Sequence, residues 1–131
     1  MSQKNVEIVQ QSFVVWGETG EPDWSTIHEE EVEVHDHDIM DAGEYRGRSG
    51  VERWLEDWSS AWLEFSMDPE EFIDAGERVV FLFRMTATGR GSGVRVERQD
   101  AMVFEVRDGM VVRLDYYNNR QHALESVGLA E

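Results

Sequence analysis

The sequence predicts an α+β domain in which helices cover one face of an antiparallel sheet. Apolar residues recur at three-and-four spacing early in the chain, whereas apolar and polar residues alternate in residues 94–106 and 110–117. The turn Arg107-Asp108-Gly109 separates two alternating runs, which is a strong signal for a β-hairpin. A length of 131 residues suits one domain, 1–131, that buries a sizeable core.

The amino-acid composition indicates a globular protein and excludes several kinds of site and partner. A hydrophobic content of 40% is typical of globular domains, and the absence of cysteine excludes disulfides and thiolate metal sites. The net charge of −16 repels phosphate backbones and anionic lipids, so we expect neither nucleic-acid nor membrane partners. Because no signal peptide or long apolar run is visible, we expect a cytoplasmic protein. Residues 18–44 contain no Lys or Arg, which indicates a solvated acidic surface or a docking face for a basic partner.

The first elements are helical and lead into a strand. Residues 3–17 form an amphipathic helical pattern, and a break containing glycine and proline separates it from a short helix through Trp24 that Asp23 caps. Residues 31–38 alternate and predict a strand. Its two faces hold Val32, Val34 and Asp36 on one side and Glu33, His35 and His37 on the other.

A second long helix is expected to begin at a capping box formed by Ser49 and Glu52. It should run to about Phe65, ahead of Pro69. Its apolar side consists of Val51, Leu55, Trp58 and Trp62. An aromatic stripe at helical spacing belongs more often to a core than to a platform for ligand stacking, so we assign it to the interior.

Four strands and a closing helix follow. Residues 67–73 predict a short strand and residues 79–88 a strongly apolar one. One face of the apolar strand holds Val80, Leu82, Arg84 and Thr86. After the hairpin, Asn119 caps a final helix that Gly128 ends.

The hairpin of residues 94–106 and 110–117 contains two acids on strand faces. One face of its first strand holds Val94, Val96, Arg98, Asp100, Met102, Phe104 and Val106. An acid between apolar residues on a face directed at the core is paired, protonated or functional. The second strand adds Asp115 and Tyr117 on one face, and both aspartates are therefore candidate site residues.

The chain resembles the SnoaL-like branch of the nuclear transport factor 2-like superfamily in its order of elements. The same resemblance is carried by the motifs FVVWGETGEPDW, VEVHDHD, GVERWLEDW, FIDAGERVVFLF and VFEVRDGMVVRLDYYNNRQHALESVGL. The resemblance covers nearly the whole chain. It implies a cone-shaped fold, in which a curved, mostly antiparallel sheet is closed by three N-terminal helices around an apolar pocket, and a homodimer formed through the sheet. Relatives include polyketide cyclases, ketosteroid isomerases, dehydratases, epoxide hydrolases and non-catalytic modules, so the resemblance identifies the fold better than the function.

The ketosteroid isomerase pattern of that superfamily matches two aspartates. By this resemblance, Asp36 stands at the position of the general base and Asp100 at that of a protonated acid that donates to an oxyanion. The tyrosine that these enzymes carry on the first helix would fall near Ser12 or Phe13, neither of which supplies a phenol.

The epoxide hydrolase and polyketide cyclase patterns point to further residues. Asp115 and Arg84 resemble the last-strand aspartate and the arginine of the hydrolases, whereas Thr86 stands at their other acid. The cyclases use one inward acid as a base, and Asp36, Asp100 or Asp115 can serve. The candidate catalytic residues are therefore these three aspartates and Arg84.

A structural interpretation competes with catalysis. Arg98 and Arg84 can pair with Asp100 and Asp115 in a buried network. His35 and His37 could hold a metal with a third ligand, but we favour an exposed acidic strand end and expect neither a metal nor another cofactor.

Two functional hypotheses follow. The first is a cofactor-free isomerase, cyclase or hydrolase that acts on a small, largely apolar molecule, with inward carboxylates at the site. The second is a binding or dimerisation module of the same fold, whose acids are paired and whose tryptophans fill the interior. For the first, the expected substrate-binding residues are Phe13, Trp16, Trp58, Trp62, Met102, Phe104 and Tyr117.

Overall fold

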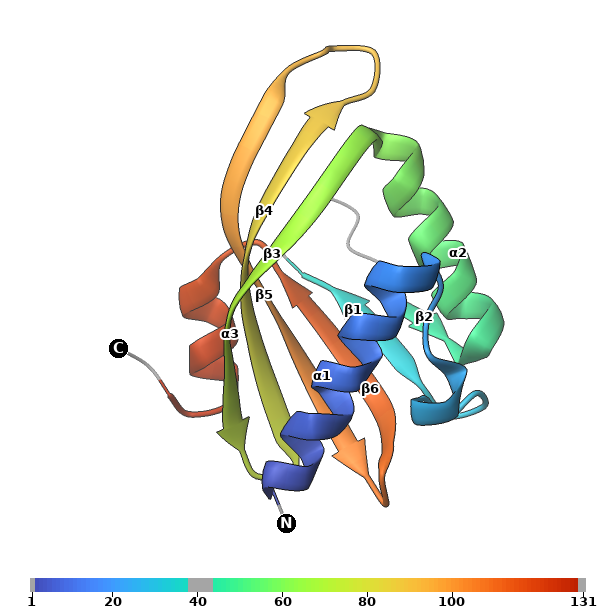
Figure 1. Ribbon diagram of the computed structural model, residues 1–131, viewed down its shortest axis with the longest axis vertical. Helices are drawn as coiled ribbons and strands as arrows, with labels where there is room; N and C mark the ends of the chain where they lie inside the picture. Colours follow the sequence, from blue (N-terminus) through green and yellow to red (C-terminus); the bar gives the residue numbers. More distant parts are fainter. Residues whose placement is uncertain (1, 38–43, 130–131) are drawn as a thin grey trace.

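The computed structural model describes residues 2–37 and 44–129 of the chain (Figure 1). In chain order, its elements are α1 (Ser2–Thr19), the short 3-10 helix η1 (Trp24–Thr26), β1 (Glu33–Asp36), β2 (Glu44–Arg46), α2 (Gly47–Ala61), β3 (Trp62–Ala75), β4 (Arg78–Gly89), β5 (Arg95–Arg107), β6 (Met110–Tyr117) and α3 (Arg120–Ser126). None of the helices in these described ranges is long and apolar enough to cross a membrane.

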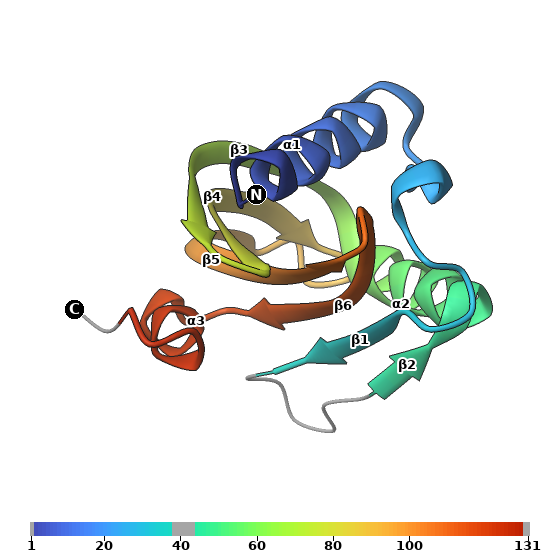
Figure 2. The same cartoon turned by 90° about the horizontal axis from the view of Figure 1, so that it is seen from below.

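The strands form one six-stranded sheet in the order β2-β1-β6-β5-β4-β3. Within this sheet the β1–β6 pair is parallel, and the other neighbouring strands are antiparallel. The sheet curls around α1, while α2 covers the part near β1 and β6, and α3 lies on the opposite, outer side (Figure 2). The expected α+β fold, a curved sheet closed by helices from the N-terminal half, is confirmed.

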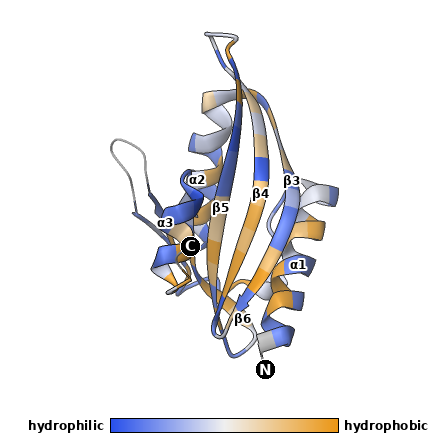
Figure 3. Cartoon of the chain, turned by 90° about the vertical axis from the view of Figure 1, so that its left-hand side faces the viewer, coloured by the Kyte–Doolittle hydropathy of each residue, from blue (hydrophilic) through white to orange (hydrophobic). Residues whose placement is uncertain are grey.

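Two clusters of buried side chains lie on opposite faces of the sheet. The inner cluster joins α2 to the concave face and contains Val32, Val34, Val51, Trp54, Phe81, Phe83, Met85, Ala87, Met102 and Tyr116. The outer cluster packs α3 against the back of the sheet and contains Val80, Leu82, Ala101, Val103, Ala123 and Leu124. Along β5 the apolar residues lie in the half nearest the N-terminus of α1, and the other half is hydrophilic (Figure 3).

Several predicted caps and turns are confirmed. The Asp23 carboxylate accepts a hydrogen bond from the Ser25 amide at the start of η1, and the Asn119 side chain accepts one from the His122 amide at the start of α3. In the hairpin turn, Asp108 and Gly109 both have positive φ, at 53° and 80°. This is the geometry that a type I′ turn requires, and it explains the Asp-Gly sequence.

The predicted start of α2 is wrong. The helix begins at Gly47, after Arg46, and no side chain caps its end. Main-chain carbonyls fix this end instead: the Gly47 amide donates to Val32 O and the Arg48 amide to Glu29 O, each at 2.7 Å. Gly47 adopts a φ of +72°, which favours glycine at this position. The capping box predicted at Ser49 did not locate this start, because the carbonyls that accept the hydrogen bonds belong to residues remote in the sequence.

The predicted end of α2 and the predicted strand 67–73 also need correction. The helix ends at Ala61, and β3 runs from Trp62 through Pro69 to Ala75. Pairing with β4 holds this segment extended, with Phe65 opposite Ala87, and register shifts at Trp62/Glu64 and Pro69/Glu71 accommodate the irregular positions. Tertiary pairing therefore overrides the helical pattern that continues to Phe65.

Candidate active site

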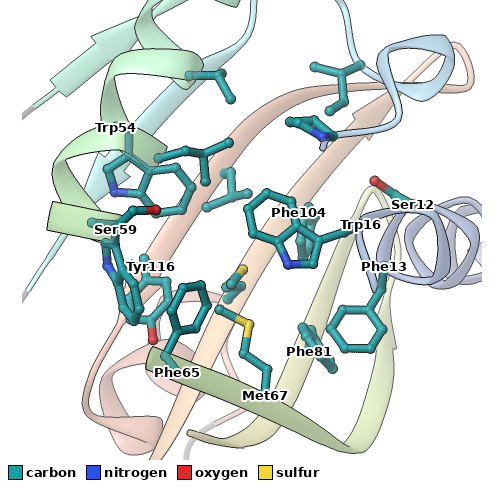
Figure 4. Close-up of a pocket in the computed structure, with 17 residues that line it drawn as sticks. Ser12, Phe13, Trp16, Trp54, Ser59, Phe65, Met67, Phe81, Phe104 and Tyr116 are labelled. Carbon is teal, nitrogen blue, oxygen red and sulfur yellow. The ribbon is translucent and has the colours of Figure 1, made fainter. Parts of the chain in front are cut away.

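One cavity, here called the apolar pocket, has a volume of about 110 Å³ and lies between α1, α2 and the concave face of the sheet (Figure 4). Most of its lining is aliphatic or aromatic, and comprises Ser12, Phe13, Trp16, Pro22, Ile27, Val51, Trp54, Leu55, Trp58, Ser59, Phe65, Met67, Phe81, Met102, Phe104, Leu114 and Tyr116. The strands contribute every second residue, because alternate side chains share one face. Such walls suit a ligand held mainly by apolar contacts.

Five of the seven expected substrate-binding residues line the apolar pocket, namely Phe13, Trp16, Trp58, Met102 and Phe104. Trp62 lines the second cavity instead. Tyr117 lies on the outer face of the sheet, where its ring stacks on that of His37 with centroids 4.4 Å apart. The expectation that Tyr117 faces the pocket is therefore wrong, and Tyr116, which pairs with Met102 across the strands, lies there in its place.

The second cavity, here called the aromatic cleft, has a volume of about 230 Å³. It is lined by Asp36, His37, Tyr45, Trp54, Asp57, Trp58, Ala61, Trp62, Arg98, Tyr116 and Asn118. Trp54, Trp58 and Tyr116 line both cavities, so their side chains form the boundary between them.

Asp36 lies at the end of β1 with only 5% of its surface exposed. Its Oδ2 accepts a hydrogen bond of 2.8 Å from the indole Nε1 of Trp54, and β1 places it beside Tyr116 of β6. The predicted face of this strand is correct, since Val32, Val34 and Asp36 are all buried. The carboxylate lines the aromatic cleft, beside Trp54 and Tyr116.

Asp100 is fully buried and accepts three hydrogen bonds. Arg98 donates two of them in a bidentate arrangement, at 2.7 and 2.9 Å, and the Tyr116 hydroxyl donates the third at 2.5 Å. Both oxygens of Asp100 are thus engaged by Arg98 or Tyr116, and Asp100 lines neither cavity, so we do not carry forward the oxyanion-donor role. The competing interpretation, an ion pair of Asp100 with Arg98, describes the observed geometry.

Asp115 and Arg84 lie on the outer face of the sheet, which corrects their expected inward position. Asp115 is held by Arg113 and by His37, whose Nε2 is 2.7 Å from its Oδ1. Burial alone would raise the pKa of Asp115, but the hydrogen bonds from Arg113 and His37 outweigh it and lower that pKa. Arg84 pairs with Glu97, and both side chains are half exposed. The register of the hairpin, with Asp115 opposite Val103, decides this orientation.

The three candidate aspartates therefore do not open into one cavity. Asp36 lines the aromatic cleft, whereas Asp100 and Asp115 line neither of the two cavities. Within residues 2–37 and 44–129, no three His, Asp or Glu side chains come together in a way that could hold a metal ion. His35, one of the two histidines considered for such a site, lies 3.0 Å from Glu33.

Comparison with known families agrees with this geometry. The model of the SnoaL-like domain family matches residues 9–114 of the chain. The chain belongs to the SnoaL-like family. No curated protein matches its sequence.

Solved structures similar to this SnoaL-like protein share its fold at low sequence identity. TerC, co-crystallised with polyporic acid, has a TM-score of 0.76 at 21% identity, with 95% of this chain and 98% of that chain covered. An NTF2-like protein from Burkholderia xenovorans LB400 has a TM-score of 0.74 at 25% identity, with 89% and 90% covered. A protein described as a SnoaL-like polyketide cyclase, from Mesorhizobium loti, has a TM-score of 0.71 at 14% identity, with 85% and 96% covered.

Two residues that organise the site of this SnoaL-like protein, Trp54 and Tyr116, were not among the predicted site residues. Trp54 supplies the hydrogen bond to Asp36, and Tyr116 links the apolar pocket to the Arg98–Asp100 pair. The alternation of Leu114 and Tyr116 on β6 was a usable signal for an inward face, but alternation does not say which face is inward. Nothing in the sequence pattern indicated the contact between Trp54 and Asp36.

Tyr116 should make the stability of the SnoaL-like protein sensitive to alkaline pH. Burial, followed by the nearby charge of Asp100, raises the pKa of Tyr116 far above its usual value. The folded state therefore keeps a proton that the unfolded chain loses, so this contribution is complete below about pH 10 and declines as the pH rises further. Urea unfolding between about pH 9 and pH 11 should show a shallower loss of stability in Tyr116→Phe than in the wild type.

The same substitution has a cost at neutral pH. Tyr116→Phe removes one hydrogen bond to the buried Asp100 carboxylate, which should lower the free energy of unfolding by about 1.5–3 kcal/mol at pH 7. Tyr117→Phe, on the outer face, is the matched control. An alkaline slope equal to that of the wild type in Tyr116→Phe would contradict the assignment.

Proposed function

We propose that this protein binds a small, largely apolar molecule in the apolar pocket. The observation that carries the proposal is a cavity of about 110 Å³ with nearly all-apolar walls, which lies inside a chain of net charge −16. Burial of apolar ligand surface against such walls drives binding without any need for charge complementarity. The neighbour TerC, crystallised with polyporic acid, supports an organic ligand for this fold.

We further infer that the bound molecule undergoes cofactor-free acid–base chemistry, an isomerisation or a cyclisation. Asp36 would act as the base, because it is the one predicted catalytic aspartate that lines either of the two cavities described above. It lies beside Trp54 and Tyr116, whose side chains line both cavities, so a ligand that extends from the apolar pocket into the aromatic cleft would reach it. The hydrolase pattern receives no support, since Asp115 and Arg84 lie on the outer face.

A non-catalytic binding module is the second candidate. The observation in its favour is that Asp100 and Asp115 are both paired with arginine, which satisfies buried carboxylates without any catalytic role. Binding in the apolar pocket is common to both candidates, so it can be tested first.

Filling the pocket should weaken binding of an apolar probe. Ser12 on α1 lines the pocket, and Ser12→Trp would place a large ring in it. We expect saturable binding of the neutral fluorophore N-phenyl-1-naphthylamine to the wild type and affinity at least about tenfold weaker for the variant, a difference of 1.4 kcal/mol. Fluorescence titration gives both dissociation constants.

Val14→Trp is the matched control, because Val14 lies two residues away on the same helix and is 53% exposed. It should bind the probe as the wild type does. If the wild type shows no saturable binding, or if both tryptophan variants bind equally well, the proposed ligand site is wrong.

A further inference from the structure

The aromatic cleft combines ring walls with negative charge. Its rings are tilted against one another: Trp58 meets Trp62 at 48° with centroids 5.8 Å apart, and meets Tyr116 at 55° with centroids 5.6 Å apart. Trp54 in turn meets Tyr116 at 63°. Because these rings are tilted and not parallel, they line the cleft from different directions.

Two carboxylates line the same space. Asp36 lies at one part of the lining, and Asp57 of α2 accepts a hydrogen bond of 3.1 Å from the Tyr45 hydroxyl. The pKa of Tyr45 is raised, first by burial, then by its hydrogen bond to Asp57 and by the charges of Asp57 and Asp36.

The positive groups in the lining are already matched by acids. Arg98 lines the cleft, but it makes its bidentate pair with the buried Asp100. His37 is bound to Asp115, which also binds Arg113. Asp36 and Asp57 thus bring two further carboxylates to the lining, in a protein whose net charge of −16 already concentrates cations around it.

We propose that the aromatic cleft is a binding site for a small methylated ammonium ion. The faces of tryptophan and tyrosine rings attract a cation through their negative quadrupole, and a methylated ammonium ion is easier to strip of water than a metal ion. The rings of Trp58 and Trp62 and the Asp36 and Asp57 carboxylates supply the two attractions that such an ion needs. The inference concerns the aromatic cleft and holds whatever occupies the apolar pocket.

The test uses choline and its neutral isostere 3,3-dimethyl-1-butanol, which has a carbon atom in place of the charged nitrogen. Titration followed by the indole N–H signals in NMR should show saturable binding of choline, with an affinity at least about tenfold higher than that of the alcohol. Equal binding of the two molecules would overturn the proposal, because it would show that charge is not recognised.

Variants assign the binding to the cleft. Asp57→Asn should weaken choline binding about fivefold to tenfold, whereas Asp68→Asn, which removes an exposed acid of β3 outside both cavities, should leave it unchanged. Trp62→Leu should weaken it to a similar degree, and Trp62→Phe, which keeps an aromatic face, should restore part of the affinity. Equal losses in Asp57→Asn and Asp68→Asn would mean that only the overall charge attracts the ion. That result, or wild-type affinity in both Asp57→Asn and Trp62→Leu, would also overturn the site.

Discussion

Replacing Arg98 by alanine is expected to lower the free energy of unfolding by about 3–5 kcal/mol. Asp100 is fully buried, and Arg98 donates two of the three hydrogen bonds that the Asp100 carboxylate accepts. Among the residues that the structure describes, the variant would leave this buried carboxylate with the Tyr116 hydroxyl as its remaining donor. Urea unfolding at pH 7 measures the loss, provided that the slope with denaturant is unchanged.

Arg84→Ala is the control for this measurement. Arg84 also pairs with an acid, Glu97, but the side chains of both partners are 51% exposed. Solvent screens such a pair, so the expected loss is within about 1 kcal/mol. Equal losses of unfolding free energy in the two arginine variants would show that the burial of Asp100 does not increase the contribution of its ion pair to stability.

Removing the carboxylate should cost less than removing the guanidinium. The Arg98 side chain is 32% exposed, so in Asp100→Asn it can turn toward water. The double variant of Arg98→Ala with Asp100→Asn should therefore be more stable than Arg98→Ala alone, because it no longer buries an unpaired charge. A double variant less stable than Arg98→Ala would refute this explanation.

Asp36→Asn is expected to reduce proton exchange on a bound ketone by about 10²–10⁴-fold, the usual contribution of a positioned base. A base that removes a proton next to a carbonyl also exchanges that proton with D₂O, even when no product accumulates. The rate of deuterium incorporation into 1-tetralone, followed by NMR and corrected for the buffer reaction, measures this activity. Asparagine keeps the shape of the side chain and can still accept the hydrogen bond from Trp54, so folding should be preserved.

Asp115→Asn is the matched control, since Asp115 lies on the outer face with Arg113 and His37. It should exchange protons at the wild-type rate. Wild-type exchange in Asp36→Asn would exclude Asp36 as the base. If the wild type binds ketones but exchanges none of their protons, the protein is the binding module of the second candidate.

Local patterns predicted the secondary structure where nearby residues decide it. The Asp108-Gly109 turn, the caps at Asp23 and Asn119, and the buried face of β1 that ends in Asp36 all follow from short-range geometry. The predictions failed where a remote partner decides the conformation. Pairing with β4 draws residues 62–65 into β3, and carbonyls of residues 29 and 32 fix the start of α2.

The sequence by itself determined an α+β SnoaL-like fold, five side chains of the apolar pocket and the presence of acids on strand faces. Alternation says which residues share a face, but only the register of strands that meet in the sheet says which face turns inward. That register placed Tyr116 inside, and Tyr117, Asp115 and Arg84 outside. Arg98 was expected as a partner of Asp100, but the donors from remote elements, Trp54 to Asp36 and His37 to Asp115, were decided by the tertiary structure. A charged group removed from water is stabilised by whichever donors the fold brings to it.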